Sequence, residues 1–395
     1  MHIFLMQFLR SLSVCLCSLA LLQPAFADNG DTQAIRFATF NIAMGLDSEG
    51  ELYARLQSGE DEALKKVAAI IQQVRPDVLL LNEFDWYELD SAWLFINNYL
   101  DKSQYGNQPI SYAHALSGAV NTGVDSGLDL DGNGVTGDAA DAWGYGKFPG
   151  QYGMMVLSRF PVALKRSFRQ FKWRDMPAAL VPLNPDGTSW YPEPVFNQLR
   201  LSSKSHWDVT VSANDQDLHF LVSHPTPPVF DGPEDRNGAR NYDEIRLWAD
   251  YIDPSRSGYI YDDAGARGGL GEAARFIIAG DLNADPVDGD SSGNAIGQLL
   301  QHPLVDASCV PLSKGAEEAS ALQAGKNLEQ KGNPAADTAD FNDQYTGNMR
   351  IDYVLPSRTL KIIGCGVFWP ASGEPGHDLI GVSDHRLVWL DIDTG

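Results

Sequence analysis

The chain has 395 residues, 44% of them hydrophobic, and a formal net charge of −23. This length supplies enough apolar side chains for the core of one large domain or two ordinary ones. So acidic a surface repels polyanions, which argues against broad electrostatic binding of nucleic acid, and it attracts cations.

The N-terminal segment is typical of a secretory signal peptide. Arg10 precedes an apolar stretch from Ser11 to Leu22, and the small residues Ala25 and Ala27 follow. The apolar stretch is too short to span a bilayer comfortably. We therefore expect cleavage after Ala27 and a secreted or periplasmic mature protein, residues 28–395. No later segment is long and apolar enough to predict a membrane span.

Cleavage would also remove Cys15 and Cys17 and leave Cys309 and Cys365. An oxidising compartment allows a disulfide between these two cysteines, although the sequence alone does not establish one. No internal repeat and no long low-complexity linker interrupts the remaining chain. A single domain is therefore the simpler prediction.

The hydrophobic pattern predicts alternating strands and helices along the chain. Apolar positions at helical spacing predict a helix from Asp61 to Val74, which Pro76 ends, and a second helix over 242–252. Apolar runs typical of strands lie at 35–42, 77–84, 151–162, 198–211, 217–223, 275–281, 350–356 and 381–392. Runs that are apolar on consecutive residues, such as Phe276–Ala279, indicate strands covered on both faces. This pattern fits two packed sheets with helices outside.

Many of these apolar runs begin or end with a side chain suited to chemistry. The residues concerned are Asn41, Glu83, His224, Asp281, Asn283, Asp352, Asp384 and His385. One polar strand end is readily explained as a turn, but the repetition indicates that these side chains converge on one edge of the sheets. Individually, Asn41 fits a cap, Glu83 a surface acid, and Asp352 a simple ion pair with Arg350.

Carboxylate and amide oxygens are hard ligands that suit magnesium, calcium or manganese. The sequence has no clustered cysteines and no closely spaced histidine triad, which argues against a zinc site. Hydrolysis of a phosphate ester requires neutralised charge on the phosphoryl oxygens, an activated water, and a proton or metal for the leaving oxygen. The residues at the strand ends include candidates for all three tasks.

Six short motifs occur in an order that resembles a known family. TFN at 39–41, LNEF at 81–84, SHPTP at 223–227, GDLNADP at 280–286, RIDYVL at 350–355 and SDHR at 383–386 are similar to the motif series of the endonuclease/exonuclease/phosphatase superfamily, which has the DNase I-like fold. The resemblance covers residues 35–392. It implies a four-layer α/β/β/α sandwich of two mixed sheets, with the active site at their shared edge.

The resemblance also implies roles for individual residues. Asn41 and Glu83 correspond to metal-site residues for Mg²⁺ or Mn²⁺, with Asp384 as an additional ligand. In the catalytic group that the resemblance implies, Asp281 acts on the attacking water and Asn283 binds a phosphate oxygen. His385 is the catalytic histidine, and Asp352 is its orienting partner. His224 corresponds to the second histidine of the DNase-like and sphingomyelinase-like branches.

Residues 127–141 resemble a calcium-binding loop. The D-x-D-x-N-G start places oxygen donors at alternate positions, followed by a glycine for the sharp turn, at Asp129, Asp131, Asn133 and Gly134. The loop departs from an EF-hand at its twelfth position, where Ala140 replaces glutamate, so that Asp138 or Asp141 would have to close it. A solvated acidic loop is the alternative.

Five basic side chains are candidates for contacting the substrate: Arg200, Lys204, His206, Arg236 and Arg240. The first three alternate along the predicted strand 198–211 and would share one face. The last two lie in the Gly- and Pro-rich segment 229–244, which we expect to form a lid or a substrate wall. The alternative for the first three residues is an exposed strand face without a functional role. The alternative for the segment 229–244 is a surface loop.

The sequence therefore predicts a secreted, monomeric hydrolase that uses a divalent metal and an Asp–His pair to cleave a phosphate ester, as a phosphodiesterase or phosphatase does. One alternative is an extracellular endonuclease, for which nucleic acid would be the substrate. A second alternative is a calcium-stabilised binding protein without catalytic activity.

Overall fold

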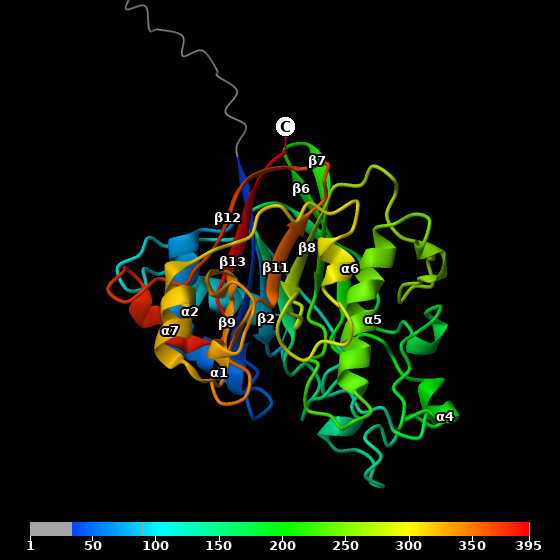
Figure 1. Cartoon of the computed structure of the whole chain (residues 1–395). Coiled ribbons are helices and arrows are strands. Elements are labelled where there is room, and N and C mark those ends of the chain that lie inside the picture. The colour runs from blue at the N-terminus through cyan, green and yellow to red at the C-terminus, as the bar shows by residue number, and fades with distance from the viewer. Residues whose placement is uncertain (1–33, 89, 395) are drawn as a thin grey trace, which may run out of the picture. The chain divides into compact units, whose positions relative to one another are not determined.

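The computed structural model describes residues 34–88 and 90–394, which belong to one compact unit. The predicted signal peptide lies outside these residues. Figure 1 shows two β-sheets packed against each other, with helices on their outer faces. None of the helices in the described part of the chain is long and apolar enough to cross a membrane.

The first sheet has six strands in the order β12-β13-β1-β2-β4-β3. Strands β1 and β2 are parallel, whereas the other neighbours are antiparallel. The bounds are β1 Ile35–Met44, β2 Val78–Phe84, β3 His114–Ser117, β4 Met154–Ser158, β12 Lys361–Val367 and β13 Val388–Asp393.

The second sheet has five strands in the order β11-β8-β7-β6-β5. Here β7 and β8 are parallel, and the other pairs are antiparallel. The bounds are β5 Val162–Ser167, β6 His206–Ala213, β7 Gln216–Ser223, β8 Phe276–Asp281 and β11 Asp352–Pro356. A small third sheet pairs β9 Ala339–Asp340 with β10 Asn348–Met349.

The inner faces of the two large sheets form a shared core. Apolar side chains from both sheets are buried there, and the rings of Phe37 on β1 and Phe220 on β7 lie 5.3 Å apart. Burying this apolar surface stabilises the sheets at about 25 cal/mol per Å². It also explains why β2 and β8 are apolar on consecutive residues, since the opposite face of each sheet is covered by helices.

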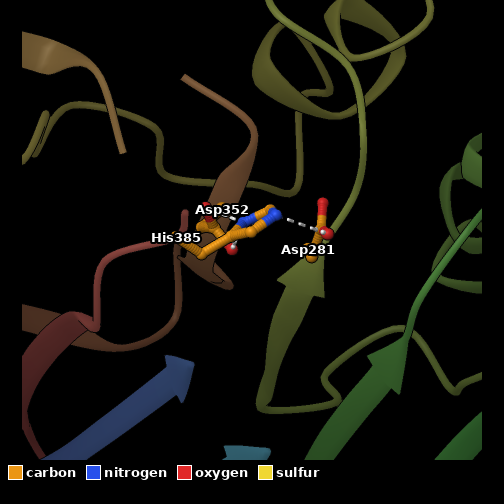
Figure 2. Close-up of side chains that lie close together, drawn as sticks. All are labelled: Asp281, Asp352 and His385. Atoms are coloured by element: carbon orange, nitrogen blue, oxygen red, sulfur yellow. Dashed lines mark hydrogen bonds and ion pairs between the residues drawn. The ribbon is translucent and has the colours of Figure 1, made fainter. Parts of the chain in front are cut away.

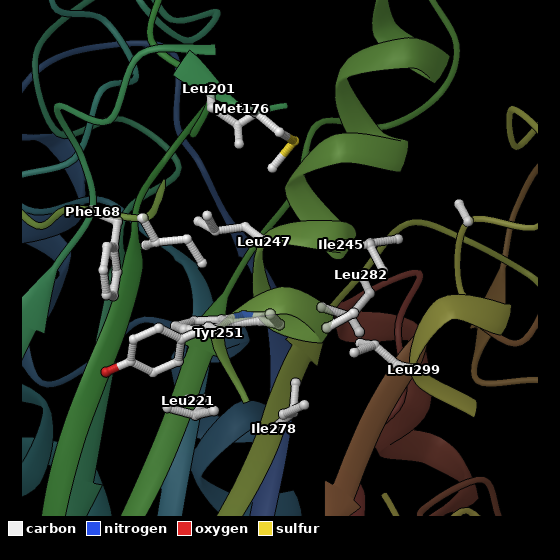
Figure 3. Close-up of a cluster of buried hydrophobic side chains, with 14 of the residues drawn as sticks. Phe168, Met176, Leu201, Leu221, Ile245, Leu247, Tyr251, Ile278, Leu282 and Leu299 are labelled. Atoms are coloured by element: carbon white, nitrogen blue, oxygen red, sulfur yellow. The ribbon is translucent and has the colours of Figure 1, made fainter. Parts of the chain in front are cut away.

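Two outer cores complete four layers. Helices α1 Glu51–Ser58, α2 Glu62–Val74 and α3 Ser91–Phe95, with the π-helix Ile96–Leu100, cover the first sheet. Helices α5 Arg236–Tyr251 and α6 Gly297–Leu300 cover the second sheet, where Ile245, Leu247 and Tyr251 pack on Leu221 and Ile278, as Figure 3 shows. The predicted α/β/β/α sandwich is therefore confirmed.

The helix α2 matches its prediction because its end signals are strong. The side chain of Asp61 accepts a hydrogen bond from the Leu64 amide at the N-terminus, and Arg75 ends the helix in the left-handed conformation before Pro76. By contrast, α5 begins at Arg236, six residues before the predicted start. Its first turns carry few apolar residues, so the pattern gave no helical period. Arg236 and Arg240 therefore lie on a helix and not in a loop.

The remaining helical elements are short, except for α7 Lys314–Gln323, which Ser313 caps through the Ala316 amide. They are α4 Glu193–Phe196 and the 3₁₀ turns Ala139–Asp141, Trp173–Asp175, Ser257–Tyr259, Gly325–Leu328, Pro334–Ala336 and His377–Val382. Cys309 and Cys365 form a disulfide that ties the segment after α6 to β12. The pairing suggested by the sequence is thus present.

Candidate active site

The strand directions bring the polar strand ends to one edge of the sandwich. Asn41 and Glu83 lie near the C-terminal ends of the parallel strands β1 and β2, and Asp281 ends β8. Because β11 runs antiparallel to β8, its first residue, Asp352, pairs directly with Asp281. His385 comes three residues before β13 on the same edge. The convergence predicted from the sequence is therefore observed.

Asp281, His385 and Asp352 form a chain of interactions, shown in Figure 2. The Nδ1 atom of His385 lies 3.0 Å from Oδ2 of Asp352, and its Nε2 atom lies 3.5 Å from Oδ2 of Asp281. All three side chains are buried. The ring is thus oriented by one carboxylate while its other nitrogen faces a second one, an arrangement that suits proton transfer or hydrogen bonding to a substrate. Donor atoms of the three residues also lie within 4.8 Å of one another, which is compatible with a metal.

The charges within this group oppose the effect of burial. Burial alone would lower the pKa of His385, but the carboxylates of Asp352 and Asp281 outweigh it and raise the pKa to about 10. Burial also raises the pKa of Asp352, which the charge of His385 partly offsets, to about 6. Burial also raises the pKa of Asp281, but the effects of His385 and His224 are larger and hold that pKa below its usual range. At neutral pH the group is therefore an imidazolium between two carboxylates.

The second histidine, His224, lies directly after β7 and contacts the same carboxylate. Its Nε2 atom is 3.3 Å from Oδ2 of Asp281. Burial, and then the positive charge of Lys204, lower the pKa of His224, so its ring is neutral at neutral pH. Its Nδ1 atom is buried without a hydrogen-bond partner among the described residues. The site therefore combines one charged and one neutral imidazole on either side of Asp281.

Backbone irregularities set the position of the predicted metal-site residues. The pairing of β1 with β2 shifts between Asn41 and Met44, and Glu83 has a φ of 55°. Non-glycine residues seldom adopt that left-handed conformation, and such strain is concentrated at functional sites. The amide Nδ2 of Asn41 donates to Oε1 of Glu83 and to Oδ2 of Asp281, each at 3.1 Å. The three side chains are therefore held as one unit.

The donor set at this end of the site fits a hard divalent cation. Glu83 is partly exposed and lines the cavity, and its Oε2 atom forms no hydrogen bond or ion pair among the described residues. Asp384 also lines the cavity, with its side chain 51% exposed and Oδ1 4.0 Å from Nε2 of His385. Oxygen-only donors that still face solvent suit Mg²⁺ or Mn²⁺, which keep several water ligands.

Close packing of the sheet ends explains part of the GDLNADP motif. A Cβ atom on Gly280 would lie 2.0 Å from the carbonyl oxygen of Ser223, so β8 can approach the end of β7 only with glycine there. Three residues after Gly280, Asn283 adopts a φ of 51°, and its Nδ2 donates to the carbonyl of Pro225 at 3.1 Å. Its amide thus lies in the cavity beside the segment that carries His224.

Six of the site residues line a cavity of about 1280 Å³: Glu83, His224, Asp281, Asn283, Asp384 and His385. Aromatic side chains, among them Tyr145, Phe230 and Tyr345, form much of its outer wall and are largely exposed. Acidic side chains also line it, at Asp131, Asp285, Asp288, Asp290 and Glu329. The cavity is therefore large enough for a small-molecule substrate, and its wall carries negative charge.

The five basic residues predicted to contact the substrate differ in their positions. Because β6 begins only at His206, Arg200 and Lys204 precede the strand, and the predicted alternating face does not form. His206 is fully buried, with its ring nitrogens bonded to Ser202 and to the carbonyl of Glu244. That ring is therefore structural.

The three arginines of this set are used largely within the fold. The guanidinium of Arg240 donates to the carbonyls of Leu201, Trp143, Arg200 and Ser202. Arg200 donates to Asn121 and stacks on Trp143. Arg236 lines the cavity but pairs with Glu234. Lys204 also lines the cavity and has no such partner.

The acidic loop lies beside the same cavity. Carboxylate oxygens of Asp129, Asp131 and Asp141 lie within 4.8 Å of one another. Asp138 instead caps the 3₁₀ turn through the Ala140 amide and accepts a hydrogen bond from Asn133. Of the two acids that the sequence offered for closing the loop, the structure therefore places Asp141 in the cluster.

Sequence reasoning missed residues that support the site from behind. Thr338 donates its hydroxyl hydrogen to Oδ2 of Asp352 at 2.8 Å. Oδ1 of Asn82 accepts the backbone N–H of Asp281. Asn82 was detectable because it adjoins Glu83 in LNEF, but Thr338 lies in a segment without any motif. The ring of Phe341 packs edge-on against His385, which shields the imidazole from water.

Structural comparison finds similar folds at low sequence identity. An endonuclease/exonuclease/phosphatase from Beutenbergia cavernae DSM 12333 is 20% identical, with a TM-score of 0.49, over 92% of this chain and 72% of that one. Sphingomyelinase C from Streptomyces griseocarneus is 16% identical, with a TM-score of 0.48, over 91% and 99% of the two chains. Beta toxin from Staphylococcus aureus with bound magnesium ions is 12% identical, with a TM-score of 0.46, over the same shares.

A search of curated proteins finds no significant match. The family comparison is decisive, because the model of the Endonuclease/Exonuclease/phosphatase family matches residues 38–385. That match spans every motif residue from Asn41 to His385 and nearly the whole described chain. The protein therefore belongs to the endonuclease/exonuclease/phosphatase family.

Proposed function

We propose that this protein is a secreted, divalent-metal-dependent hydrolase of small phosphate esters. The observation that carries the proposal is the arrangement around Asp281, which contacts two histidines and the Asn41–Glu83 pair at the base of one cavity. The family consists of enzymes that hydrolyse phosphoesters, which agrees with this chemistry.

The side chains divide the reaction between them. A bound Mg²⁺ or Mn²⁺ would supply charge neutralisation at a phosphoryl oxygen and increase the acidity of bound water. Glu83 and Asn41 would hold this cation, with Asp384 as a further oxygen donor. Asp281 is ionised because the histidines lower its pKa, so its carboxylate can orient the attacking water in line with the leaving group.

The two histidines act on the phosphate from different protonation states. His385 is charged at neutral pH, since its pKa is raised to about 10, so its Nε2–H can donate to a phosphoryl oxygen. Asp352 fixes the ring through Nδ1. His224 is neutral and offers a hydrogen bond without adding charge. Stabilising the charge that develops on oxygen in the transition state is commonly worth about 10²–10³-fold in rate per donor.

The charge of the cavity wall favours a substrate with a single phosphate. Asp285, Asp288 and Asp290 lie along the wall, in a chain whose net charge is −23. Successive phosphates of DNA or RNA would meet these acids, whereas one phosphate at the base would meet only the site itself. The competing proposal is an extracellular endonuclease, whose substrate would be nucleic acid.

Export of the protein is a separate part of the proposal. Two features support it: the N-terminal segment with signal-peptide character, and the Cys309–Cys365 disulfide, which persists in oxidising compartments. N-terminal sequencing of the protein recovered outside the cytoplasm should begin at Asp28. A protein that still begins at Met1 would contradict cleavage after Ala27.

A substrate panel tests the hydrolase. The mature protein would be assayed with Mg²⁺ or Mn²⁺ on bis(4-nitrophenyl) phosphate, 4-nitrophenyl phosphate and plasmid DNA, with Asp281→Asn as the inactive control. We expect turnover of a small ester well above plasmid cleavage. Preferential plasmid cleavage would identify a nuclease, and no turnover of any of the three would favour the non-catalytic alternative.

A further inference from the structure

Lys204 is an unusual residue of this site. It is the only lysine in the described part of the chain that is buried, with 7% of its surface exposed. Its ammonium forms no hydrogen bond or ion pair with any described residue, yet the side chain lines the catalytic cavity. A buried charge without a partner is costly, and such groups are usually paired or removed. Burial lowers the pKa of Lys204, and the nearby carboxylates of Glu244, Glu83 and Asp281 oppose this effect without forming an ion pair with it. The side chain is thus left able to bind a group from outside the folded chain.

The backbone around Lys204 is held rigidly. Its carbonyl oxygen accepts the Asn121 amide at 2.9 Å. The preceding residue, Ser203, donates both its amide and its hydroxyl to Oε1 of Glu244 on α5, at 2.6 and 3.0 Å. A Cβ atom on Gly144 would lie 1.8 Å from the Ser203 carbonyl, so that loop can pack here only with glycine. The backbone position of the lysine is therefore fixed before any substrate binds.

The same glutamate connects Lys204 to the catalytic edge. The second carboxylate oxygen of Glu244 accepts the amide of Thr226, two residues after His224. One buried side chain thus fixes the segment carrying Lys204 and the segment carrying His224. The two segments also interact electrostatically, because Lys204 adds to the effect of burial in lowering the pKa of His224. In turn, burial lowers the pKa of Lys204, and the carboxylates of Glu244, Glu83 and Asp281 oppose that shift.

The other basic side chains nearby cannot serve the same purpose. Arg240 is occupied by four carbonyl oxygens, and Arg236 is paired with Glu234. His224 is neutral. Lys204 is thus the cation near His224 that has hydrogen-bonding capacity left for a ligand. With three N–H donors, it can bind the oxygens of a phosphate.

We propose that Lys204 binds a non-bridging oxygen of the substrate's phosphate on the His224 side of the site. This inference rests on the proposed function and adds a fixed protein charge to the contribution of the metal and His385. It accounts for how a chain with a net charge of −23 attracts an anionic substrate to its cavity. The lysine would stabilise the negative charge that grows on the phosphoryl oxygens as water attacks.

The test compares Lys204→Met, Lys204→Arg and the exposed control Lys165→Met. We expect Lys204→Met to lower kcat/KM for a small phosphate ester by about 10²-fold, and to weaken competitive inhibition by inorganic phosphate. Its melting temperature should stay the same or rise, because an unpaired buried charge is removed. Lys204→Arg should recover part of both losses, and Lys165→Met should match the wild type.

Two results would overturn the inference. One is a Lys204→Met variant with kcat/KM and phosphate inhibition within about threefold of the wild type, a loss well below that expected for one phosphoryl-oxygen donor. The other is a loss of activity accompanied by a lower melting temperature and unchanged phosphate inhibition, which would make the lysine structural. If Lys204→Met does not fold, Lys204→Gln replaces it under the same criteria.

A failure of the proposed function can be told apart from a failure of this inference. If the wild type hydrolyses no ester, binding of inorganic phosphate in the presence of Mg²⁺ would be measured by calorimetry. Binding by the wild type that Lys204→Met loses would support the phosphate contact. Equal binding by both proteins, or none by either, would overturn it.

Discussion

Two acidic regions border the same cavity and differ in what surrounds their carboxylates. Asp281 and Asp352 are buried and share the ring of His385, whereas Asp129 and Asp131 lie in a largely exposed loop. A third carboxylate, that of Asp337, is buried without a neighbouring cation among the described residues. Burial, together with the charges of Asp285 and Asp288, raises the pKa of Asp337 to about 8. The neighbouring cations, and not burial alone, therefore decide whether a carboxylate is charged and available for chemistry.

The largest effect should come from Asp281→Asn, which removes the charge between the two histidines but keeps the shape. We expect kcat to fall by about 10³-fold, since the water would lose its orienting carboxylate. The melting temperature should change little because an amide can still bond to Asn41. Steady-state kinetics on a nitrophenyl ester would measure this, with exposed Asp101→Asn as the matched control. Activity equal to that of the control would remove Asp281 from the mechanism.

A smaller effect is expected from Asp352→Asn, which changes only the orienting partner of His385. An amide there no longer holds the positive charge on the ring, and the pKa of His385 should fall from its raised value of about 10. We expect a decrease of about 10²-fold in kcat, with the alkaline limit of the pH–rate profile moved to lower pH. A profile that keeps its alkaline limit would contradict the assigned role of Asp352.

Asp337 tests the comparison through the pH dependence of the protein's thermal stability. Its folded pKa of about 8 exceeds the unfolded value of 3.8, so the folded protein binds the extra proton between these values. The stabilising contribution is therefore complete below about pH 4 and is lost as the pH rises towards 8. Asp337→Asn should reduce the fall in melting temperature between pH 5 and pH 9 by about 2 °C or more. An unchanged fall, measured by calorimetry, would show that Asp337 is not protonated.

The smallest effect concerns the exposed loop. If Asp129, Asp131 and Asp141 bind Ca²⁺, millimolar Ca²⁺ should raise the melting temperature by about 1–4 °C through preferential binding to the folded state. Asp131→Asn should abolish the increase, while Asp281→Asn should leave it intact. A melting temperature and a calorimetric trace that Ca²⁺ does not alter would identify a solvated acidic loop.

Much of the fold was predictable because its strongest signals are local. The α2 helix has an Asp61 cap and an apolar stripe, and the runs that became β2 and β8 are apolar enough to require cover on both faces. The start of α5 was missed because its polar residues are stabilised by tertiary contacts, such as those of Arg240 with backbone carbonyls. Such contacts have no periodicity in the sequence.

The catalytic residues were identifiable from ordered motifs, whereas the roles of the basic residues were not. Arg200, Lys204 and His206 look alike in the sequence, but one stacks on Trp143, one faces the cavity and one is fully buried. The outcome depends on where β6 begins and on which carbonyls α5 must satisfy. Thr338 illustrates the same limit, because a lone threonine carries no sign that it supports Asp352 from 14 residues away.

The most direct test of the central claim is hydrolysis of bis(4-nitrophenyl) phosphate by the metal-free mature protein, before and after Mg²⁺ or Mn²⁺ is added, in the wild type and in Glu83→Gln. We predict no turnover without metal, recovery on addition, and a higher metal requirement for Glu83→Gln. Turnover that persists without metal, or that responds to metal identically in both proteins, would contradict the account.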